Sequence, residues 1–327
     1  FSCMNKFKRY FFIFFVFLFH NPTYGFEIFE VNKLHSSNVD LIPNYKGDLP
    51  LTNLKFLSGL EITGNHPKFG GLSGLVLSSN FDFFSVSDKG YWIKGKLDFN
   101  EEFKLKSLSN VTMGYLKDEN NVPFNRKSNT DAEAIEILNN KFIISFERNH
   151  RVLSYDTLES HSKTLINYKQ LSDLPNNGGI ESISPLKDSS LLLLSEDHVV
   201  ENDKLIGFRF FNHEMEQLLF KKTGDYKPTD IASLPSGDIL LLERSFSPIK
   251  GASARISLIK FDDLFTKSLI EPIHLDTISP PMTVDNFEGI SYIHLKNGGY
   301  YIFILSDDNY RSSQRTLLMQ FYWNGKV

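Results

Sequence analysis

The chain has almost no cysteine, and its histidines are not clustered. Cys3 is the only cysteine among 327 residues, and the nine histidines are scattered without the close spacing of a metal-ligand pair. A disulfide framework needs at least two cysteines, and structural zinc sites use cysteine and histidine at short, regular spacings. These absences exclude a disulfide-stapled scaffold and disfavour zinc enzymes and cysteine nucleophiles, so packing must stabilise the fold.

Long apolar runs are absent too, apart from one near the N-terminus. That run, residues 10–19, follows a basic segment and precedes Thr23-Tyr24-Gly25, which places small residues where a signal peptidase cleaves. It is about half as long as the roughly 20 residues that span a bilayer. We predict that residues 1–25 are an upstream extension and a cleaved signal peptide, which would also remove Cys3. Residues 26–327 would then form one exported domain, periplasmic or extracellular, without a stable membrane span, and an uncleaved anchor is the alternative.

Positive charge is not in excess either. Thirty-five lysines and arginines against 39 aspartates and glutamates leave a net charge of −4, and no basic stripe runs along the chain. We therefore expect no nucleic-acid partner. The G-x-S-x-G, H-E-x-x-H and glycine-rich nucleotide-binding motifs are missing as well. These gaps disfavour common serine hydrolases, zinc peptidases and dinucleotide enzymes, and we expect a monomer that binds a small molecule.

The sequence is rich in short apolar strands separated by turns. Strands such as KFIISFE, SLLLLSE and YYIFILSD each follow a first strand and precede a third and a more polar fourth. The pattern begins at five positions about 50 residues apart, which is the period of β-propeller blades. We predict an all-β fold, a propeller of five four-stranded antiparallel blades.

Both ends of the chain affect the blade count. The last blade stops one strand short, and residues 54–63 can supply its outer strand and close the ring. Residues 26–34 and the loop after them could belong to a sixth blade, so six blades are the close alternative. A β-sandwich or two separate β-domains would leave the shared chemistry of five hairpins without an explanation.

Each hairpin opens its first strand with a polar residue and closes its second strand with an acid. In an antiparallel hairpin the residue numbers of two facing residues add up to a constant, so the residue halfway between them in sequence should lie in the turn. In all five pairs this halfway position includes Asn, Asp, Ser or Gly, which tight turns favour. The first strands of a propeller line its channel, so these residues should gather at one mouth. The pairs are Ser73/Asp88, Glu133/Glu147, Glu181/Glu196, Asp230/Glu243 and Glu288/Asp307.

So many acids at one mouth need neutralising charges. Two carboxylates about 6 Å apart repel by roughly 3 kcal/mol at an effective dielectric near 20. A ligand set of carboxylates, carbonyls and amides without cysteine favours Ca²⁺, or else Mg²⁺. Basic residues beside the acids could bind a phosphate ester or another anionic ligand through forked hydrogen bonds. The alternative is that the acids only accept hydrogen bonds from backbone amides and so join the blades.

Several segments resemble those of the bacterial phytase-like family that is named for esterase-like activity. They are KFGGLSGL…SVSDKG, DAEAIEIL…ISFERNHR, NGGIESIS, KPTDIASLPSGDILLLERSFSP…GASARI and VDNFEGISYI…LSDDNYRSSQRTLLMQF. The resemblance covers residues 69–321 and implies an exported β-propeller related to calcium-dependent propeller phytases. It also implies that the acids and arginines of these motifs form a phosphoesterase or phosphodiesterase site.

We therefore expect an exported, metal-dependent phosphoric ester hydrolase with its site at the channel mouth. The expected catalytic residues are Glu133, Asp230, Glu243, Glu288 and Asp307. The expected metal ligands are Asp131, Glu133, Glu147, Glu181, Glu196, Asp230, Asp285, Glu288, Asp307 and Asp308. The expected substrate-binding residues are Arg148, Arg244, Arg255, Arg315 and Lys227. A non-catalytic propeller that binds a ligand or partner protein is the alternative, and a calcium-dependent lactonase or carboxylesterase is a third hypothesis.

Overall fold

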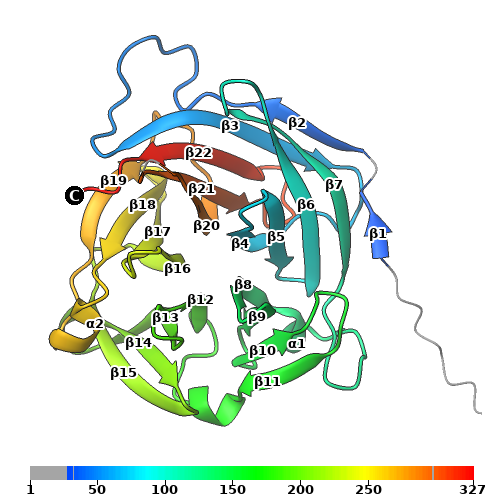
Figure 1. Ribbon diagram of the computed structural model, residues 1–327, viewed down its shortest axis with the longest axis vertical. Coiled ribbons are helices and arrows are strands. Elements are labelled where there is room, and N and C mark those ends of the chain that lie inside the picture. The colour runs from blue at the N-terminus through cyan, green and yellow to red at the C-terminus, as the bar shows by residue number, and fades with distance from the viewer. Residues whose placement is uncertain (1–27, 32, 297) are drawn as a thin grey trace, which may run out of the picture.

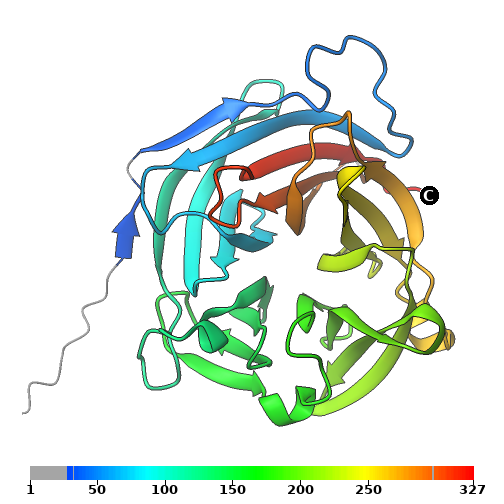
Figure 2. The same ribbon diagram turned by 180° about the vertical axis from the view of Figure 1, so that it is seen from behind.

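Five antiparallel sheets form a ring around a central axis in the computed structural model, which describes residues 28–31, 33–296 and 298–327 (Figure 1). Figure 2 shows the same ring from its other face. The predicted five-bladed propeller is confirmed, and the described N-terminal strands join existing blades rather than a sixth. The predicted extension and signal peptide, residues 1–25, lie outside the described residues.

The blades follow one another along the chain, each with its first strand innermost. Blade 1 contains β4 (Leu72–Leu77), β5 (Asp82–Ser87), β6 (Tyr91–Phe99), β7 (Leu105–Tyr115) and β1 (Ile28–Glu30). Blade 2 contains β8 (Ala132–Leu138), β9 (Lys141–Phe146), β10 (Arg151–Tyr155) and β11 (Ser162–Ile166). Blade 3 contains β12 (Ile180–Pro185), β13 (Leu191–Val200), β14 (Lys204–Phe211) and β15 (Glu214–Lys221).

The last two blades complete the ring. Blade 4 contains β16 (Lys227–Ser233), β17 (Ile239–Ser247), β18 (Gly251–Ile259) and β19 (Ile273–Ile278). Blade 5 contains β20 (Asn286–His294), β21 (Tyr300–Asp307), β22 (Leu317–Trp323), β3 (Leu54–Gly64) and β2 (Leu34–Asn38). The described helices are short: α1 (Lys127–Thr130), α2 (Asp263–Thr266), η1 (Tyr168–Leu171) and η2 (Glu201–Asp203). No helix in the described part of the chain is long and apolar enough to cross a bilayer.

The predicted closure of the ring by an N-terminal strand is confirmed. Strand β3 pairs with β22 in antiparallel register, with Leu54 opposite Trp323 and Leu60 opposite Leu318. The neighbouring β2 adds a fifth strand to blade 5, whereas β1 pairs with β7 of blade 1. The N-terminal segment therefore joins the last blade to the first, as Figure 1 shows.

The predicted hairpin turns are confirmed as well. Each turn between the first and second strands holds a residue in the left-handed region, where short polar residues and glycine are favoured. The φ angles are 60° at Asn140, 68° at Ser189 and 96° at Gly237. Phe81 at 66° is the exception in residue type, and it follows Asn80 in the turn of blade 1.

The blades are held together by apolar side chains from both faces of each sheet. Leu191, Leu192, Leu193 and Leu194 of β13 are all at most 2% exposed, because neighbouring blades cover both faces of this strand. This explains why the second strands read as continuous apolar runs rather than alternating ones. A rigid framework of this kind presents the strand ends of all five blades at a common face.

The first strands contain β-bulges near the ends that face the acidic mouth. In β8, Ala132 faces Phe146 and Ala134 faces Ser145, so Glu133 is the extra, unpaired residue. The same shift surrounds Glu181 in β12 and Glu288 in β20. Bulges change the direction of side chains. The members of each predicted pair therefore lie at the same hairpin end but not directly opposite each other.

The pairing of residues across the hairpin of blade 4 differs most clearly from the prediction. The bulge of this blade contains Thr229, so Asp230 faces Leu242 and Glu243 faces Pro228. The prediction that Asp230 and Glu243 face each other is wrong, because a hairpin midpoint does not reveal the extra residue of a bulge. The position that follows Glu243, closer to the mouth, is occupied by Arg244.

Candidate metal and ester-binding site

A cavity of about 240 Å³ lies at the channel mouth where the first strands begin, and every blade contributes to its wall. Eight of its lining residues are acids and only three are basic. The acids are Asp88, Asp131, Glu133, Glu147, Glu181, Glu196, Glu288 and Asp307, and the basic residues are Lys127, Arg148 and Arg244. This excess of negative charge is the main electrostatic property of the cavity, which we call the acidic pocket.

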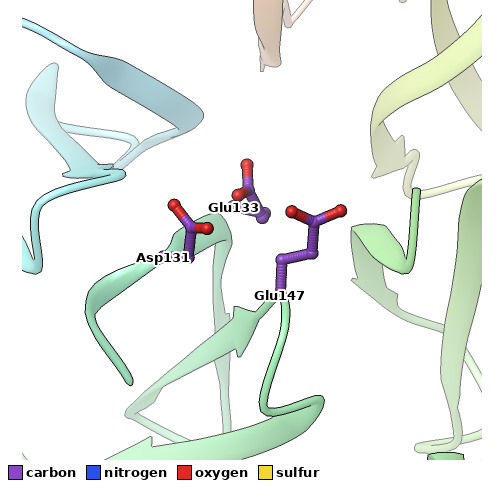
Figure 3. Close-up of side chains that lie close together, drawn as sticks. All are labelled: Asp131, Glu133 and Glu147. Carbon is purple, nitrogen blue, oxygen red and sulfur yellow. The ribbon is translucent and has the colours of Figure 1, made fainter. Parts of the chain in front are cut away.

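Three of these acids, all from blade 2, form a compact cluster. Each of Asp131, Glu133 and Glu147 offers one oxygen, and the three oxygens lie within 4.8 Å of one another. Asp131 follows α1, Glu133 lies on the bulge of β8, and Glu147 follows β9 (Figure 3). Carboxylate oxygens at this spacing are suitable ligands for a hard divalent cation such as Ca²⁺ or Mg²⁺.

Two members of this cluster are already oriented by other groups. Asp131 accepts a close hydrogen bond from the Nε of Arg148 and lies 3.3 Å from the Nζ of Lys127. The carboxylate of Glu147 accepts a close hydrogen bond from the backbone N–H of Gly178 in the next blade. These contacts hold the two carboxylates in place. They engage Oδ1 and Oδ2 of Asp131, whereas Glu147 uses Oε1 and keeps Oε2 outside these contacts.

Glu133 differs from both of them. Among the described residues no hydrogen bond or ion pair reaches its side chain. Burial, and then repulsion from Glu181 and Glu288, raises the pKa of Glu133 well above its usual range. A carboxyl group in this position is protonated when nothing compensates its charge, and a bound cation would favour its ionised form.

Arg244 is the basic group that joins three blades at the pocket. It extends from β17 to Glu196 of blade 3, with Nη2 and Oε1 3.2 Å apart. On the blade 5 side it donates to the Oδ1 of Asn286 at 2.6 Å and lies 3.4 Å from the Oε1 of Glu288. Its Nε is buried and has no partner among the described residues. Burial still raises the pKa of Glu288, although Arg244 opposes this effect.

Two further acids of the pocket, Asp307 and Glu181, also have raised pKa values. Burial, and then repulsion from Glu288, raises the pKa of Asp307 to about 9. Burial also raises the pKa of Glu181, and repulsion from Glu196 and Glu288 adds to the rise. Burial therefore favours the neutral form of these carboxyl groups, and a carboxyl group in that form can donate a proton.

Two expected metal ligands instead hold the loops around the pocket. Asp308 accepts hydrogen bonds from the backbone N–H of Gly71 and of Tyr310, each at 2.9 Å. Asp285 accepts from the backbone N–H of Arg315 at 3.1 Å, and the guanidinium of Arg315 lies 3.7 Å away. Neither acid lines the acidic pocket.

Two expected catalytic acids also lie away from the pocket. Asp230 is 1% exposed and accepts from the backbone N–H groups of Ile231 and Ile290 at 2.9 and 2.8 Å. Glu243 is buried beside Arg255, with an oxygen–nitrogen distance of 3.5 Å. Both expected residues and Arg255 therefore form contacts within or between blades.

The structure brings together one part of the expected site and separates another. The expected residues in the acidic pocket are Asp131, Glu133, Glu147, Arg148, Glu181, Glu196, Arg244, Glu288 and Asp307. The expected residues outside it are Lys227, Asp230, Glu243, Arg255, Asp285, Asp308 and Arg315. The pocket also contains Asp88, which was expected at this mouth but not as a ligand or catalytic residue. Its lining further includes Lys127, Asn177, Gly178 and Asn309, which were not among the expected residues. Asn177 and Gly178 are the first two residues of the segment NGGIESIS, so its resemblance to a family motif was the available indication for them.

A larger groove of about 900 Å³ adjoins the acidic pocket. The two share Glu196, Arg244 and Asn309 as common walls. Away from the pocket the groove is lined by Lys227 and by Phe246, whose side chain is 73% exposed. The groove therefore offers apolar and charged surface next to the acids.

Comparison with known proteins supplies a family. Among solved structures, the chain is similar to a luciferin-regenerating enzyme (9% identity, 82% of this chain and 94% of that chain, TM-score 0.42). It is also similar to a protein of unknown function from Dyadobacter fermentans (9% identity, 89% of this chain and 90% of that chain, TM-score 0.45). A third similar structure is a glucose dehydrogenase (12% identity, 76% of this chain and 96% of that chain, TM-score 0.42). Similarities this weak carry no argument about function. No curated protein matches the chain. The family model described as "Phytase-like: Esterase-like activity of phytase" matches residues 67–310, most of the sequence, and the chain therefore belongs to this family.

Proposed function

We propose that the protein is an exported, metal-dependent hydrolase of phosphoric esters that acts at the acidic pocket. The observation that carries this proposal is the cluster of Asp131, Glu133 and Glu147 within 4.8 Å, directly beside the guanidinium group of Arg148. Carboxylates suit a divalent cation, and arginines suit a phosphoryl group. Membership of the phytase-like family supports the same chemistry.

Different residues of the pocket would bind the metal ion, bind the phosphoryl group and donate a proton. Asp131, Glu133 and Glu147 would hold Ca²⁺, or else Mg²⁺, which when bound neutralises phosphoryl oxygens and acidifies a water molecule. Arg244 would bind and orient the phosphoryl group, because its buried Nε has no other acceptor. Glu181 and Glu288, whose pKa values burial raises, would donate a proton to the leaving oxygen when they are in the neutral form.

The adjoining groove supports an ester with an organic leaving group. A cavity of about 240 Å³ is small for a whole organic substrate, whereas typical ligand sites hold roughly 300–1,000 Å³. The groove beyond Arg244 adds the missing space and ends at the exposed ring of Phe246. The phosphoryl group would lie among the acids, and the organic group would extend into the groove.

The test is turnover with and without metal. The purified protein is stripped with chelator, reloaded with Ca²⁺ or Mg²⁺, and assayed with 4-nitrophenyl phosphate and bis(4-nitrophenyl) phosphate. We expect hydrolysis only after reloading, loss of turnover in Glu133→Gln, and no change in Glu101→Gln, an exposed acid outside the pocket. Absence of turnover of both esters, together with absence of a metal-induced melting shift, would refute the proposal.

A non-catalytic binding propeller is the second candidate, because Asp230 and Asp308 bind backbone amides. Glu288→Gln separates the two functions. If the protein is a hydrolase, this variant loses turnover while its stability changes little. If the acids serve only as structural contacts, the variant loses stability instead. Turnover of lactones or carboxylic esters in place of phosphate esters would favour the third hypothesis.

A further inference from the structure

The two ends of the central channel hold separate cavities. Midway along it, Asp230 accepts hydrogen bonds from the backbone of its own blade and of blade 5. The inner strands approach closely here, since a Cβ at Gly289 would lie only 2.8 Å from the Cβ of Leu75. The acidic pocket and the cavity at the opposite mouth share no lining residue. The second cavity is therefore a distinct site.

This second cavity lies at the hairpin-turn ends of the first strands and has a volume of about 430 Å³. Figures 1 and 2 view the ring from its two faces. We call it the turn-side cavity. Its polar lining residues include Glu136, Ser184, Ser233, Ser291, Tyr292 and His294, contributed by blades 2 to 5.

Glu136 is the only acid among the described residues that line the turn-side cavity, and none of them is lysine or arginine. Its carboxyl group is buried and accepts a hydrogen bond from the backbone N–H of Ile137 at 3.2 Å. The hydroxyl of Ser184 lies nearby. Burial raises the pKa of Glu136 to about 8. Asp230 and Tyr292 of other blades interact electrostatically with Glu136 and bring no positive charge, and His294 of blade 5 is the other titratable side chain of the described lining.

Aromatic rings and hydroxyl groups form the rest of the wall. Tyr292 is fixed by a hydrogen bond from its hydroxyl to the carbonyl oxygen of Ser233 at 2.8 Å. His294 stacks on Tyr300 with ring centroids 5.0 Å apart. Aromatic rings beside a lone carboxylate favour a cation that carries an organic group, because the ring faces attract positive charge and the cavity accepts apolar atoms.

We propose that the turn-side cavity binds a small organic cation of the amine class, with its ammonium group on the carboxylate of Glu136 and its organic part against Tyr292 and His294. The bound ammonium supplies the positive charge that no lysine or arginine of the described lining provides. This binding is independent of the metal and ester chemistry at the acidic pocket.

Benzylamine tests the proposal, with benzyl alcohol as an uncharged ligand of nearly the same shape. We expect isothermal titration calorimetry to show benzylamine binding at least about tenfold more tightly, since a hydrogen bond between charged groups is stronger than one to a neutral hydroxyl. Affinity for benzylamine should rise from pH 6 to pH 8, because Glu136 ionises over this range while the amine stays charged. Equal binding of the two ligands, or no binding of either, would overturn the proposal without any variant.

Two variants locate the site. Glu136→Gln retains a hydrogen-bonding side chain of the same size and should weaken benzylamine about tenfold while leaving benzyl alcohol unchanged. Glu288→Gln removes an acid at the opposite mouth and should leave benzylamine affinity unchanged. Thermal melting shows whether each variant is folded. Loss of benzylamine binding in Glu288→Gln but not in Glu136→Gln would place the amine at the acidic pocket and refute the inference.

Discussion

Replacing Glu133 by glutamine should separate metal binding from structural stability. The oxygens of its cluster lie within 4.8 Å of one another, so each ionised pair repels by at least about 3.5 kcal/mol at an effective dielectric near 20. Burial and neighbouring acids already raise the pKa of Glu133 well above its usual range. Without a cation the substitution therefore removes an unfavourable group. We expect the metal-free variant to melt at the same temperature as the original protein or slightly higher.

The same substitution should remove most of the stabilisation by Ca²⁺. A cation present at 100 times its dissociation constant stabilises a folded protein by about 2.7 kcal/mol. For a chain of this size that corresponds to a rise in melting temperature of about 5 °C. Glu133→Gln removes one of three charged ligands, so most of this rise should disappear. The control Glu101→Gln makes the same chemical change at an exposed loop and should keep the full rise.

Differential scanning fluorimetry in chelator and in graded Ca²⁺ measures both quantities. The reasoning fails if Glu133→Gln retains the Ca²⁺-dependent rise, because the cation would then be bound elsewhere. It fails equally if the metal-free variant melts several degrees lower, since Glu133 would then make a stabilising contact in the absence of metal.

Three further predictions concern stability and specificity. Burial raises the pKa of Glu136 to about 8 and of Asp307 to about 9, so the folded protein retains protons that the unfolded chain has released. In the presence of chelator, urea titrations should therefore show that the free energy of unfolding falls as the pH rises from about 5 to about 9. A free energy of unfolding that rises over this range would contradict the prediction. Asp230→Ala should destabilise the protein by about 1–3 kcal/mol in urea titrations at neutral pH, because it leaves the backbone N–H of Ile290 buried without an acceptor. If the protein is an ester hydrolase, Phe246→Ala should raise KM about two- to tenfold for aromatic phosphate esters at unchanged kcat, and an equal effect on inorganic pyrophosphate would show that Phe246 does not contact the organic group.

The five blades were predictable because their determinants are local. A turn such as Asn139-Asn140 depends on a few residues that tolerate positive φ, and apolar strands such as β13 depend on their own composition. The closing strand β3 was predictable because the last blade lacked one partner and residues 54–63 had a suitable strand pattern. Each of these inferences needs only the order of residues along the chain.

The composition of the site was predictable only in part. Glu133, Glu181 and Glu288 belong to the pocket as expected from their position at the start of first strands. Asp230 occupies a similar place in sequence but lies deeper, because the bulge of blade 4 comes one residue earlier, at Thr229. No sequence motif identifies the extra residue of a β-bulge, yet the bulge changes the direction of the side chain that follows it.

The sequence by itself determined the architecture of this protein and the acidic character of one mouth, since strand period, turn residues and charge are properties of neighbouring residues. Only the tertiary structure decided which charges meet. Arg244 reaches the pocket from blade 4 and Glu243 does not, and Lys127 joins Asp131 there. The convergence of side chains from five blades depends on bulges and on contacts between residues far apart in the chain, and these are geometric facts that no local pattern encodes.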